Sequence, residues 1–454
     1  MDSKKISSKL GNIGKVSMCK RVLKHQTTEF GEIPFYKIST FGGKADSFIA
    51  KDLYDEFREK YSFPKKGDIL ISAAGTVGET VIYDGKPAYF QDSNIVWIDN
   101  DETKILNSYL YYFFQTKPWL TTNGSTIKRI YNENLRSIEI TYPVSLQAQQ
   151  KIAAVLTALD AKIELNQRIN AELESMAKTL YDYWFVQFEF PAAHAAPSAF
   201  GTSPKFDREA LYDIQNKNVE FGGGRVGAGY KSAGGGMVWN DELKREIPKD
   251  WKVESIENCC EIVDCLHAKK PDYEFDDEKY YLLQLENIRD DGLLDLTNKY
   301  FVPKNEYQKW ISRIEVTEDD ILITNAGRVA ATAQVPKGIK TGIGRNITAI
   351  RPKSVSPTYL FSFFRSSDMI RQVRWNMDAG AFFSSLNVKG IKKLHIIRPS
   401  GDIEEQFENI VKPMRRKREE LNVESQTLTE LRDWLLPMLM NGQVTPTRPP
   451  PNGT

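Results

Sequence analysis

Apolar residues recur at alternating spacings of four and three along two long segments of the chain, with a few polar residues at the same positions. In the first segment the positions are Ile152, Leu156, Leu159, Ile163, Asn166, Asn170, Leu173, Ala177, Leu180 and Trp184. In the second they are Phe407, Ile410, Met414, Lys417, Leu421, Glu424, Leu428, Leu431, Leu435 and Met438. This spacing is typical of a coiled-coil seam and predicts two long helices, which most simply pair with each other.

The chain also contains an internal repeat. The sequence GDILISAAGTVG at Gly67–Gly78 corresponds to DDILITNAGRVA at Asp319–Ala330, with an offset of 252 residues. The same offset relates Asn94 to Asn346. Each copy contains a short apolar run that ends at a glycine turn, followed by aromatic-rich helical patches. The repeat therefore predicts two α+β domains, each large enough to hold its own core.

These two patterns divide the chain into six parts. The predicted ranges are a first globular domain at 1–145, a helix at 146–190, a Pro/Ala- and Gly-rich linker at 191–240, a second globular domain at 241–400, a helix at 401–441 and a flexible tail at 442–454. A helix of about forty residues spans roughly 60 Å, which is longer than a domain is wide. We expect the paired helices to hold the two globular domains apart.

The net charge of +1 hides an uneven distribution. From Asp241 to Gly327 there are 12 basic and 22 acidic residues, and from Arg328 to Arg398 there are 13 basic and 2 acidic residues. Such a swing is typical of a domain with one basic face, which would suit nucleic acid. Salt bridges within the domain would account for it equally simply, and the sequence leaves both interpretations open.

No arrangement of residues in the sequence indicates catalysis or a metal site. Cys265 and His267 are close together, but no cysteines form a C-x-x-C pair and the four histidines are scattered. Gly222–Gly227 has the glycine spacing of a dinucleotide-binding loop without a strand before it or a helix after it. The acidic residues Asp272 and Asp277 echo the metal-binding carboxylates of nucleases only weakly. These observations favour a binding protein over an enzyme.

No stretch of the sequence has the 18 or more apolar residues of a membrane span, and no apolar region follows Lys4 and Lys5 as it would in a signal peptide. We therefore expect a cytoplasmic location and no membrane partner.

Several short segments, in the order in which they occur, resemble one known family. They are GEIPFYK at Gly31–Lys37, LYDYWF at Leu180–Phe185, ELKRE at Glu242–Glu246 and IPKDW at Ile247–Trp251. Together with the repeat and the paired helices, they resemble the specificity subunit of type I restriction–modification enzymes. The glycine-rich stretch at 222–236 departs from the family pattern.

The resemblance implies a non-catalytic subunit with two target-recognition domains and two antiparallel helices. Each recognition domain would recognise one half of a bipartite site in double-stranded DNA, and the helices would set the spacer between the halves. The helices would also bind two methyltransferase subunits, which use S-adenosylmethionine to methylate adenine, and restriction subunits with translocase activity would join them. The chain itself would hold no cofactor.

Candidate site residues follow from the repeat and from the resemblance. Basic residues suit phosphates, and amides, hydroxyls and arginine suit base edges. The candidates for DNA contact are Lys37, Thr76, Ser93, Asn94, Lys128, Arg129, Asn325, Arg328, Arg345 and Asn346. Each could instead be a solvated charge or an amide that caps a turn. The candidates for contact with partner subunits are apolar or aromatic positions off the seam or at its end: Ile169, Tyr181, Tyr183, Phe185 and Val411.

Two other functions are compatible with the same patterns. One is a coiled-coil adaptor or scaffold whose basic face binds an acidic protein without recognising DNA sequence. The other is a single-chain enzyme, which the missing catalytic motifs disfavour.

Overall fold

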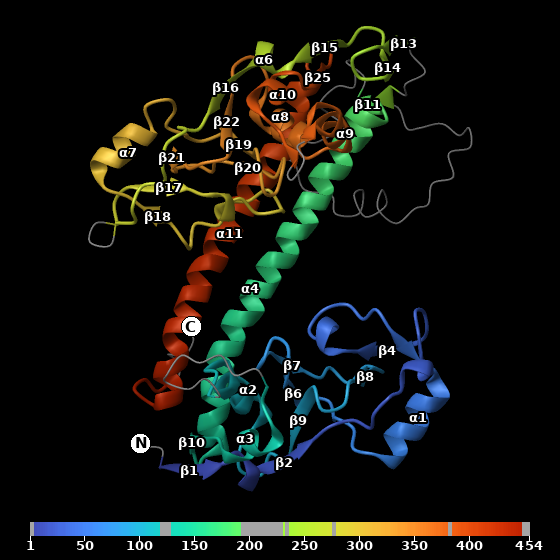
Figure 1. Ribbon diagram of the computed structural model, residues 1–454, viewed down its shortest axis with the longest axis vertical. Coiled ribbons are helices and arrows are strands. Elements are labelled where there is room, and N and C mark those ends of the chain that lie inside the picture. Colours follow the sequence, from blue (N-terminus) through green and yellow to red (C-terminus); the bar gives the residue numbers. More distant parts are fainter. Residues whose placement is uncertain are drawn as a thin grey trace, which may run out of the picture. The chain divides into compact units, whose positions relative to one another are not determined.

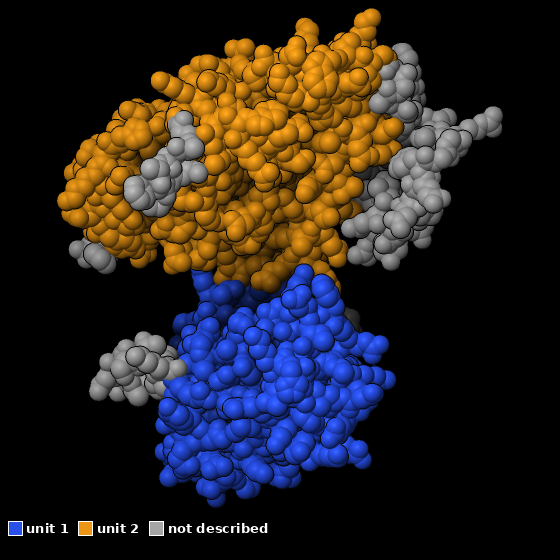
Figure 2. All heavy atoms as spheres, turned by 45° about the vertical axis from the view of Figure 1, so that its right-hand side comes forward, with its two compact units in different colours: residues 1–164, 427–454 blue, residues 165–426 orange. Residues whose placement is uncertain are grey.

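A computed structural model describes residues 4–118, 129–191, 230–231, 236–274, 278–379 and 384–446. The chain forms two compact units, which Figure 2 colours separately: unit 1 contains residues 1–164 and 427–454, and unit 2 contains residues 165–426. Both boundaries fall within long helices, so each unit contains one globular domain and part of each helix. Most of the predicted linker and the last residues of the predicted tail lie outside the described residues.

Unit 1 is built around two small sheets. The first has the strand order β2-β9-β6-β7 and is antiparallel throughout, and the second has the order β3-β5-β4-β8 with a parallel β4–β8 pair. A separate antiparallel pair joins β1 to β10. The bounds are β1 Lys5–Lys9, β2 Gly14–Ser17, β3 Thr27–Thr28, β4 Ile33–Tyr36, β5 Phe48–Ile49, β6 Ile69–Ser72, β7 Thr80–Ile82, β8 Tyr89–Phe90, β9 Ile95–Asn100 and β10 Glu139–Pro143.

Three short helices accompany these sheets: α1 Lys51–Lys60, α2 Asn107–Gln115 and α3 Asn132–Ser137. Helix α2 contacts β7 and helix α3 contacts β2 (Figure 1). One hydrophobic core lies among these elements, and it includes Tyr109 and Leu110 of α2. A second core contains residues of both sheets, among them the aromatic residues Tyr89 of β8 and Trp97 of β9.

Unit 2 repeats this arrangement. Its main sheet has the order β16-β22-β19-β20, a smaller sheet has the order β18-β17-β21 with a parallel β17–β21 pair, and β15 pairs with β25. Three further pairs are β11 with β12, β13 with β14 and β23 with β24. The bounds are β11 Phe190–Pro191, β12 Tyr230–Lys231, β13 Met237–Asn240, β14 Arg245–Pro248, β15 Lys252–Ser255, β16 Cys260–Asp264, β17 Tyr281–Leu283, β18 Tyr300–Phe301, β19 Ile321–Thr324, β20 Thr332–Gln334, β21 Gly342–Ile343, β22 Ile347–Pro352, β23 Asp378–Ala379, β24 Ser384–Ser385 and β25 His395–Arg398.

The short helices of unit 2 are α6 Ile256–Cys259, α7 Lys304–Trp310, α8 Pro357–Phe364, α9 Ser367–Asn376 and α10 Val388–Lys392. Helix α8 begins where the sequence favours a start, because the Ser356 side chain accepts a hydrogen bond from the Tyr359 amide and Pro357 occupies the first turn. Tyr359 and Leu360 are buried like their counterparts Tyr109 and Leu110 in unit 1.

The two long helices are α4, Leu146–Tyr181, and α11, Ile403–Asn441. Within unit 2 they are antiparallel, because Asn166 bonds Glu424 at 2.9 Å, Glu174 bonds Arg418, and the Tyr181 ring lies 6.0 Å from that of Phe407. The prediction of an α+β fold with two duplicated domains and two long antiparallel helices is confirmed. Helix α4 is shorter than its predicted range of 146–190, because a single π-helical turn, Asp182–Val186, follows it.

Candidate functional site

A tight turn at the end of one core strand has the same hydrogen bonds in both units. In unit 1, the Ser72 hydroxyl donates to the Thr76 carbonyl and accepts from the Glu79 amide at 2.8 Å. In unit 2, the Thr324 hydroxyl donates to the Arg328 carbonyl and accepts from the Ala331 amide at 3.0 Å. The side chain of a strand-end residue therefore fixes the turn through backbone atoms of the tip, and the side chain at the tip is not needed for the geometry.

A glycine lies directly before each tip residue, with φ of +68° at Gly75 and +79° at Gly327. Residues with a side chain rarely adopt this backbone conformation. A Cβ atom on Gly75 would also lie 3.1 Å from the Ile38 side chain. The glycine thus allows both the turn and its close approach to the segment after β4.

A second loop, which precedes β9 in unit 1 and β22 in unit 2, is bonded to this turn. The Ala73 amide donates to the Asn94 carbonyl at 2.7 Å, and the Asn325 amide donates to the Asn346 carbonyl at 2.8 Å. A third segment is bonded to the same residue of the turn. The Ile130 amide donates to the Ala73 carbonyl in unit 1, and the Leu386 amide donates to the Asn325 carbonyl in unit 2. Three segments far apart in sequence therefore meet at one edge of the sheet in each unit, and we call this edge the recognition edge.

The recognition edge brings together most of the residues chosen from the sequence. In unit 1 it holds Thr76, Ser93, Asn94 and Arg129, whose guanidinium donates to the Ser93 carbonyl at 2.9 Å. Lys37 lies beside the turn Ile38–Thr40, but its ammonium pairs with Asp46 at 2.7 Å. Lys128 lies outside the described residues.

In unit 2 the edge holds Asn325, Arg328, Arg345 and Asn346, which differ in how they are bound. Asn325 donates to Thr348 and to the Leu386 carbonyl, both at 3.0 Å, so its amide has the capping role that was the alternative interpretation. Arg328 donates to Asp290 at 2.5 Å and to the Leu285 and Ile288 carbonyls. DNA contact by these two residues stays a prediction, and their intramolecular bonds are enough to explain their positions.

Arg345 is exposed and makes no ion pair or hydrogen bond with any residue that the structure describes. Its neighbour Asn346 has φ of +61°, which suits asparagine in a turn. In unit 1 the left-handed residue is Ser93, with φ of +55°, one position earlier than the alignment of Asn94 with Asn346 implies. Arg345 is thus the most available cation at the edge of unit 2.

Internal salt bridges account for much of the charge swing in the second half of the chain. Six cations of the basic segment pair with carboxylates of the acidic segment: Arg328, Lys340, Arg351, Lys353, Lys392 and Arg398. Internal pairing therefore accounts for six of the thirteen cations of the basic segment. Arg345 is a cation at the recognition edge that takes no part in this pairing.

Sequence reasoning missed one residue at the edge of unit 1. Tyr131 is 64% exposed, and the Arg129 guanidinium lies 5.9 Å from its ring centre. Its counterpart in unit 2 is Asn387, which caps α10 by accepting from the Gly390 amide at 2.8 Å. An offset of 256 residues relates the two positions and could have identified the pair, because an aromatic residue stands where the other copy has a helix cap.

The residues predicted to bind partner subunits need a correction. Tyr181, Phe185 and Val411 are 5%, 1% and 2% exposed, and all three belong to the hydrophobic core of unit 2. Tyr183 packs partly buried against the same core, and Ile169 is half-buried. The first three positions are covered by the globular domain, so their side chains are not exposed to a partner subunit.

Asp264, Cys265 and His267 lie close enough for their ligand atoms to be within 4.8 Å of one another. Burial raises the pKa of the Cys265 thiol, and the imidazole of His267 lies 2.7 Å from the Asp264 carboxylate. Cys265 also corresponds to Cys19 of unit 1, which is equally buried in a core. This arrangement favours a structural thiol, and the absence of a metal stays a prediction.

Among the described helices, none combines the length and apolar character needed to cross a membrane.

Comparison with known proteins gives one consistent family. Residues 3–175 match the profile described as "Type I restriction modification DNA specificity domain". A putative type I restriction enzyme specificity subunit of Haemophilus influenzae is 57% identical over 147 residues, which are 32% of this chain and 38% of that protein. The MjaIX specificity subunit of Methanocaldococcus jannaschii is 24% identical over 389 residues, which cover 84% of this chain and 78% of that protein.

The fold has a solved counterpart. The crystal structure of the S subunit of a type I restriction–modification system from M. genitalium is similar with a TM-score of 0.58 at 13% identity, covering 98% of this chain and 97% of that one. The HindI specificity subunit of Haemophilus influenzae is 24% identical and covers 84% of this chain. The similarity thus extends over both units.

Proposed function

We propose, on the premise that this chain belongs to the family of type I restriction–modification specificity subunits, that it recognises a bipartite sequence in double-stranded DNA through its two recognition edges. Unit 1 would recognise one half-site and unit 2 the other. The chain itself carries out no catalysis in this proposal, and methylation and cleavage belong to other subunits.

The observation that carries this proposal is the contrast between backbone and side chains at the recognition edge. The turn and its two neighbouring segments keep the same backbone hydrogen bonds in both units. The exposed tip residue is Thr76 in one unit and Arg328 in the other, and Ser93 corresponds to Arg345. The same backbone arrangement with different side chains suits two domains that recognise different base sequences, because direct recognition depends on side chains at base edges.

The proposed partners follow from the family. Two methyltransferase subunits, which bind S-adenosylmethionine and methylate adenine, would assemble on this chain, and restriction subunits with translocase activity would join them. We propose no cofactor for the chain itself. A cytoplasmic location is the expected place for such an assembly.

Methylation-aware sequencing of the host genome, with and without the gene, tests the function directly. We expect loss of methylation at one bipartite motif when the gene is absent. The Arg345→Ala variant should relax the preference at one half-site by about 1–3 kcal/mol if the guanidinium contacts a guanine edge. Lys340→Ala, which removes an exposed lysine paired with Glu315, is the matched control and should leave the motif unchanged.

Binding to random duplex DNA separates this proposal from a protein-binding adaptor. A chain that neutralises phosphates loses affinity steeply as salt increases, because bound counterions are released. We expect this salt dependence, and its absence would favour the adaptor.

A further experiment tests whether the long helices set the spacer. Four residues inserted in α4 lengthen it by roughly 6 Å and keep the apolar seam nearly in phase. Since duplex DNA rises about 3.4 Å per base pair, the preferred spacer should grow by one or two base pairs without any change in the half-sites. An unchanged spacer would contradict the role of the helices.

A further inference from the structure

An open groove lies between helix α9 and the turn of the recognition edge in unit 2. One wall is formed by the turn and the start of β20, Arg328–Thr332, and the other includes Arg374 and Met377. The chain continues from Met377 through β23 and β24 to Leu386, whose amide bonds the Asn325 carbonyl at the edge. Helix α9 therefore flanks the recognition edge and leads directly into one of its three segments.

Helix α9 is held in place at both of its ends. At its start, the Asp368 carboxylate accepts a hydrogen bond from Arg245 of β14 at 2.7 Å. At its end, a Cβ atom on Gly390 of α10 would lie only 2.9 Å from the Asn376 carbonyl oxygen. Glycine at position 390 thus allows α10 to approach the last residue of α9, and the exposed side chains beside this contact have defined positions.

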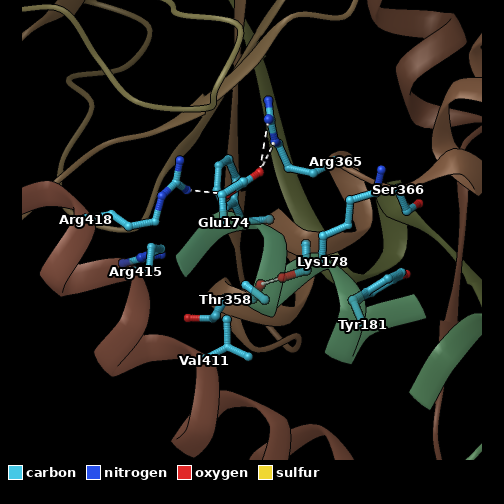
Figure 3. A pocket seen from close by; sticks show the side chains of 12 residues that line it. Glu174, Lys178, Tyr181, Thr358, Arg365, Ser366, Val411, Arg415 and Arg418 are labelled. Carbon is cyan, nitrogen blue, oxygen red and sulfur yellow. Dashed lines mark hydrogen bonds and ion pairs between the residues drawn. The ribbon is translucent and has the colours of Figure 1, made fainter. Parts of the chain in front are cut away.

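Arg374 is exposed and has no ion pair or hydrogen bond with any residue that the structure describes. The two other guanidinium groups that line the groove are already bonded. Arg365 donates to Glu174 at 3.1 Å, as Figure 3 shows, and to the Asp290 carbonyl. Arg328 donates to the Asp290 carboxylate. Arg374 can therefore bind an anionic group without breaking an existing ion pair.

Lys389 of α10 is a second exposed cation without a bonded partner in the described part of the chain. It lies three residues after Leu386 of the recognition edge and directly before Gly390, which contacts α9. By the offset of 256 residues its counterpart in unit 1 is Glu133, which pairs with Arg136 at 3.5 Å. Unit 2 thus has a free cation where unit 1 has a paired carboxylate.

We propose that α9 and α10 bind the phosphate backbone of DNA beside the half-site of unit 2, with Arg374 and Lys389 as the phosphate contacts. This inference rests on the proposed function, because it requires DNA to lie on the recognition edge. Phosphate contacts fix the register and orientation of a duplex but carry no sequence information. Arg374 and Lys389 would therefore position the DNA, and Arg345 at the edge would contact its bases.

The salt dependence of DNA binding by the full chain tests the inference. Each phosphate contact adds about 0.9 to the slope of log affinity against log salt, which is a factor of about 3 between roughly 50 and 200 mM salt. Arg374→Gln and Lys389→Gln should each reduce the salt-induced loss of affinity by about this factor. The affinity for random duplex should fall as much as that for the recognised motif, and methylation mapping should find the motif unchanged.

Lys353→Gln is the matched control. Lys353 is 59% exposed, lies 3.8 Å from Glu261 and follows the last residue of β22, whereas Asn346 of the recognition edge precedes the first. A six-residue strand spans roughly 20 Å, so this variant removes one exposed positive charge far from the edge and should keep the wild-type slope.

The outcomes separate this inference from the proposed function. Wild-type slopes in both Arg374→Gln and Lys389→Gln, or a reduction no larger than in Lys353→Gln, would overturn the inference and leave the proposed function standing. A loss of affinity for the motif alone would also overturn it, because it would indicate a base contact. A full chain that binds no duplex DNA would overturn both.

Discussion

The two units share a recognition edge but hold the long helices in different ways. In unit 2, buried arginines connect α11 to α4 and to the globular domain: Arg418 bonds Glu174 of α4 and the Asp291 carbonyl, and Arg415 bonds Asp319. In unit 1, the corresponding contacts are mainly apolar, with Leu156 of α4 and Leu439 and Met440 of α11 buried in one core. The two units therefore have the same recognition edge but different contacts with the long helices. Substitutions at these contacts should affect the two units differently.

Glu174→Ala should have the largest effect. It leaves Arg418 buried without its carboxylate, and breaking a buried ion pair in this way costs about 3–5 kcal/mol. Hydrogen exchange should show the loss in α8 and in the part of α11 that belongs to unit 2, while unit 1 keeps its protection. Glu172→Ala, an exposed change on the same helix, is the control. Equal losses in both units would show that the attachment is not specific to unit 2.

Leu439→Ala tests the apolar attachment of unit 1. Leu439 is 2% exposed, and truncating a buried leucine costs about 2–5 kcal/mol because contacts are lost and a cavity remains. Hydrogen exchange should now report the loss in unit 1 alone. Leu431→Ala removes the same atoms from a position on α11 that is 42% exposed and should cost little. A comparable cost in the control would argue against a buried apolar contact as the cause.

Thr76→Arg places in unit 1 the residue that unit 2 has at its tip. Since the turn is fixed through the Thr76 carbonyl, the unfolding free energy should change by less than about 0.5 kcal/mol. The half-site recognised by unit 1 should change, with a preference of about 1–3 kcal/mol at one base pair. Methylation mapping of the variant measures both half-sites, and a change in the half-site of unit 2 would contradict the assignment of one half-site to each unit.

The smallest effect is expected at a buried aspartate that occurs in both copies. Asp320 accepts two hydrogen bonds from Arg351, at 2.8 and 2.6 Å. Its counterpart Asp68 has Asp99 in place of that arginine. Burial raises the pKa of Asp68, and the charge of Asp99 raises it further. The folded state of unit 1 therefore binds a proton at Asp68 more tightly than the unfolded state does. The stability that this proton contributes is lost as pH rises from about 4 through the raised pKa.

Asp99→Arg should install the ion pair of unit 2 in unit 1. Removing the repulsion lowers the pKa of Asp68, so the loss of stability with rising pH should shrink, and unit 1 should gain about 1 kcal/mol or less at neutral pH. The loss of the Lys65–Asp99 pair offsets part of this gain. Chemical denaturation at pH values from about 3 to 7 measures this change in the stability of unit 1. Glu59→Arg, an exposed change of the same charge on α1, controls for net charge.

The sequence predicted those features that depend on local period and on repetition. The four-three spacing identified both long helices, and the repeat identified the sheet edge where Thr76, Asn94 and their counterparts meet. The sequence did not predict the burial of Phe185 and Val411, because an apolar stripe does not reveal which surface covers it. It also did not predict that Arg328 bonds Asp290, since the two residues lie on separate segments that only the folded sheet brings together.

The hydroxyls of Ser72 and Thr324 affect which substitutions at the tip of the turn can be tolerated during evolution. Each hydroxyl bonds a main-chain oxygen of the tip residue, an atom that every amino acid supplies. Mutation at codon 76 can therefore vary the surface presented there while the local backbone is retained, whereas mutation at codon 328 also removes the bonds of Arg328 to Asp290 and to the Leu285 and Ile288 carbonyls. The fold supplies a position of high mutational tolerance within the recognition edge, and new variants can arise there by single substitutions without first acquiring a compensating change elsewhere.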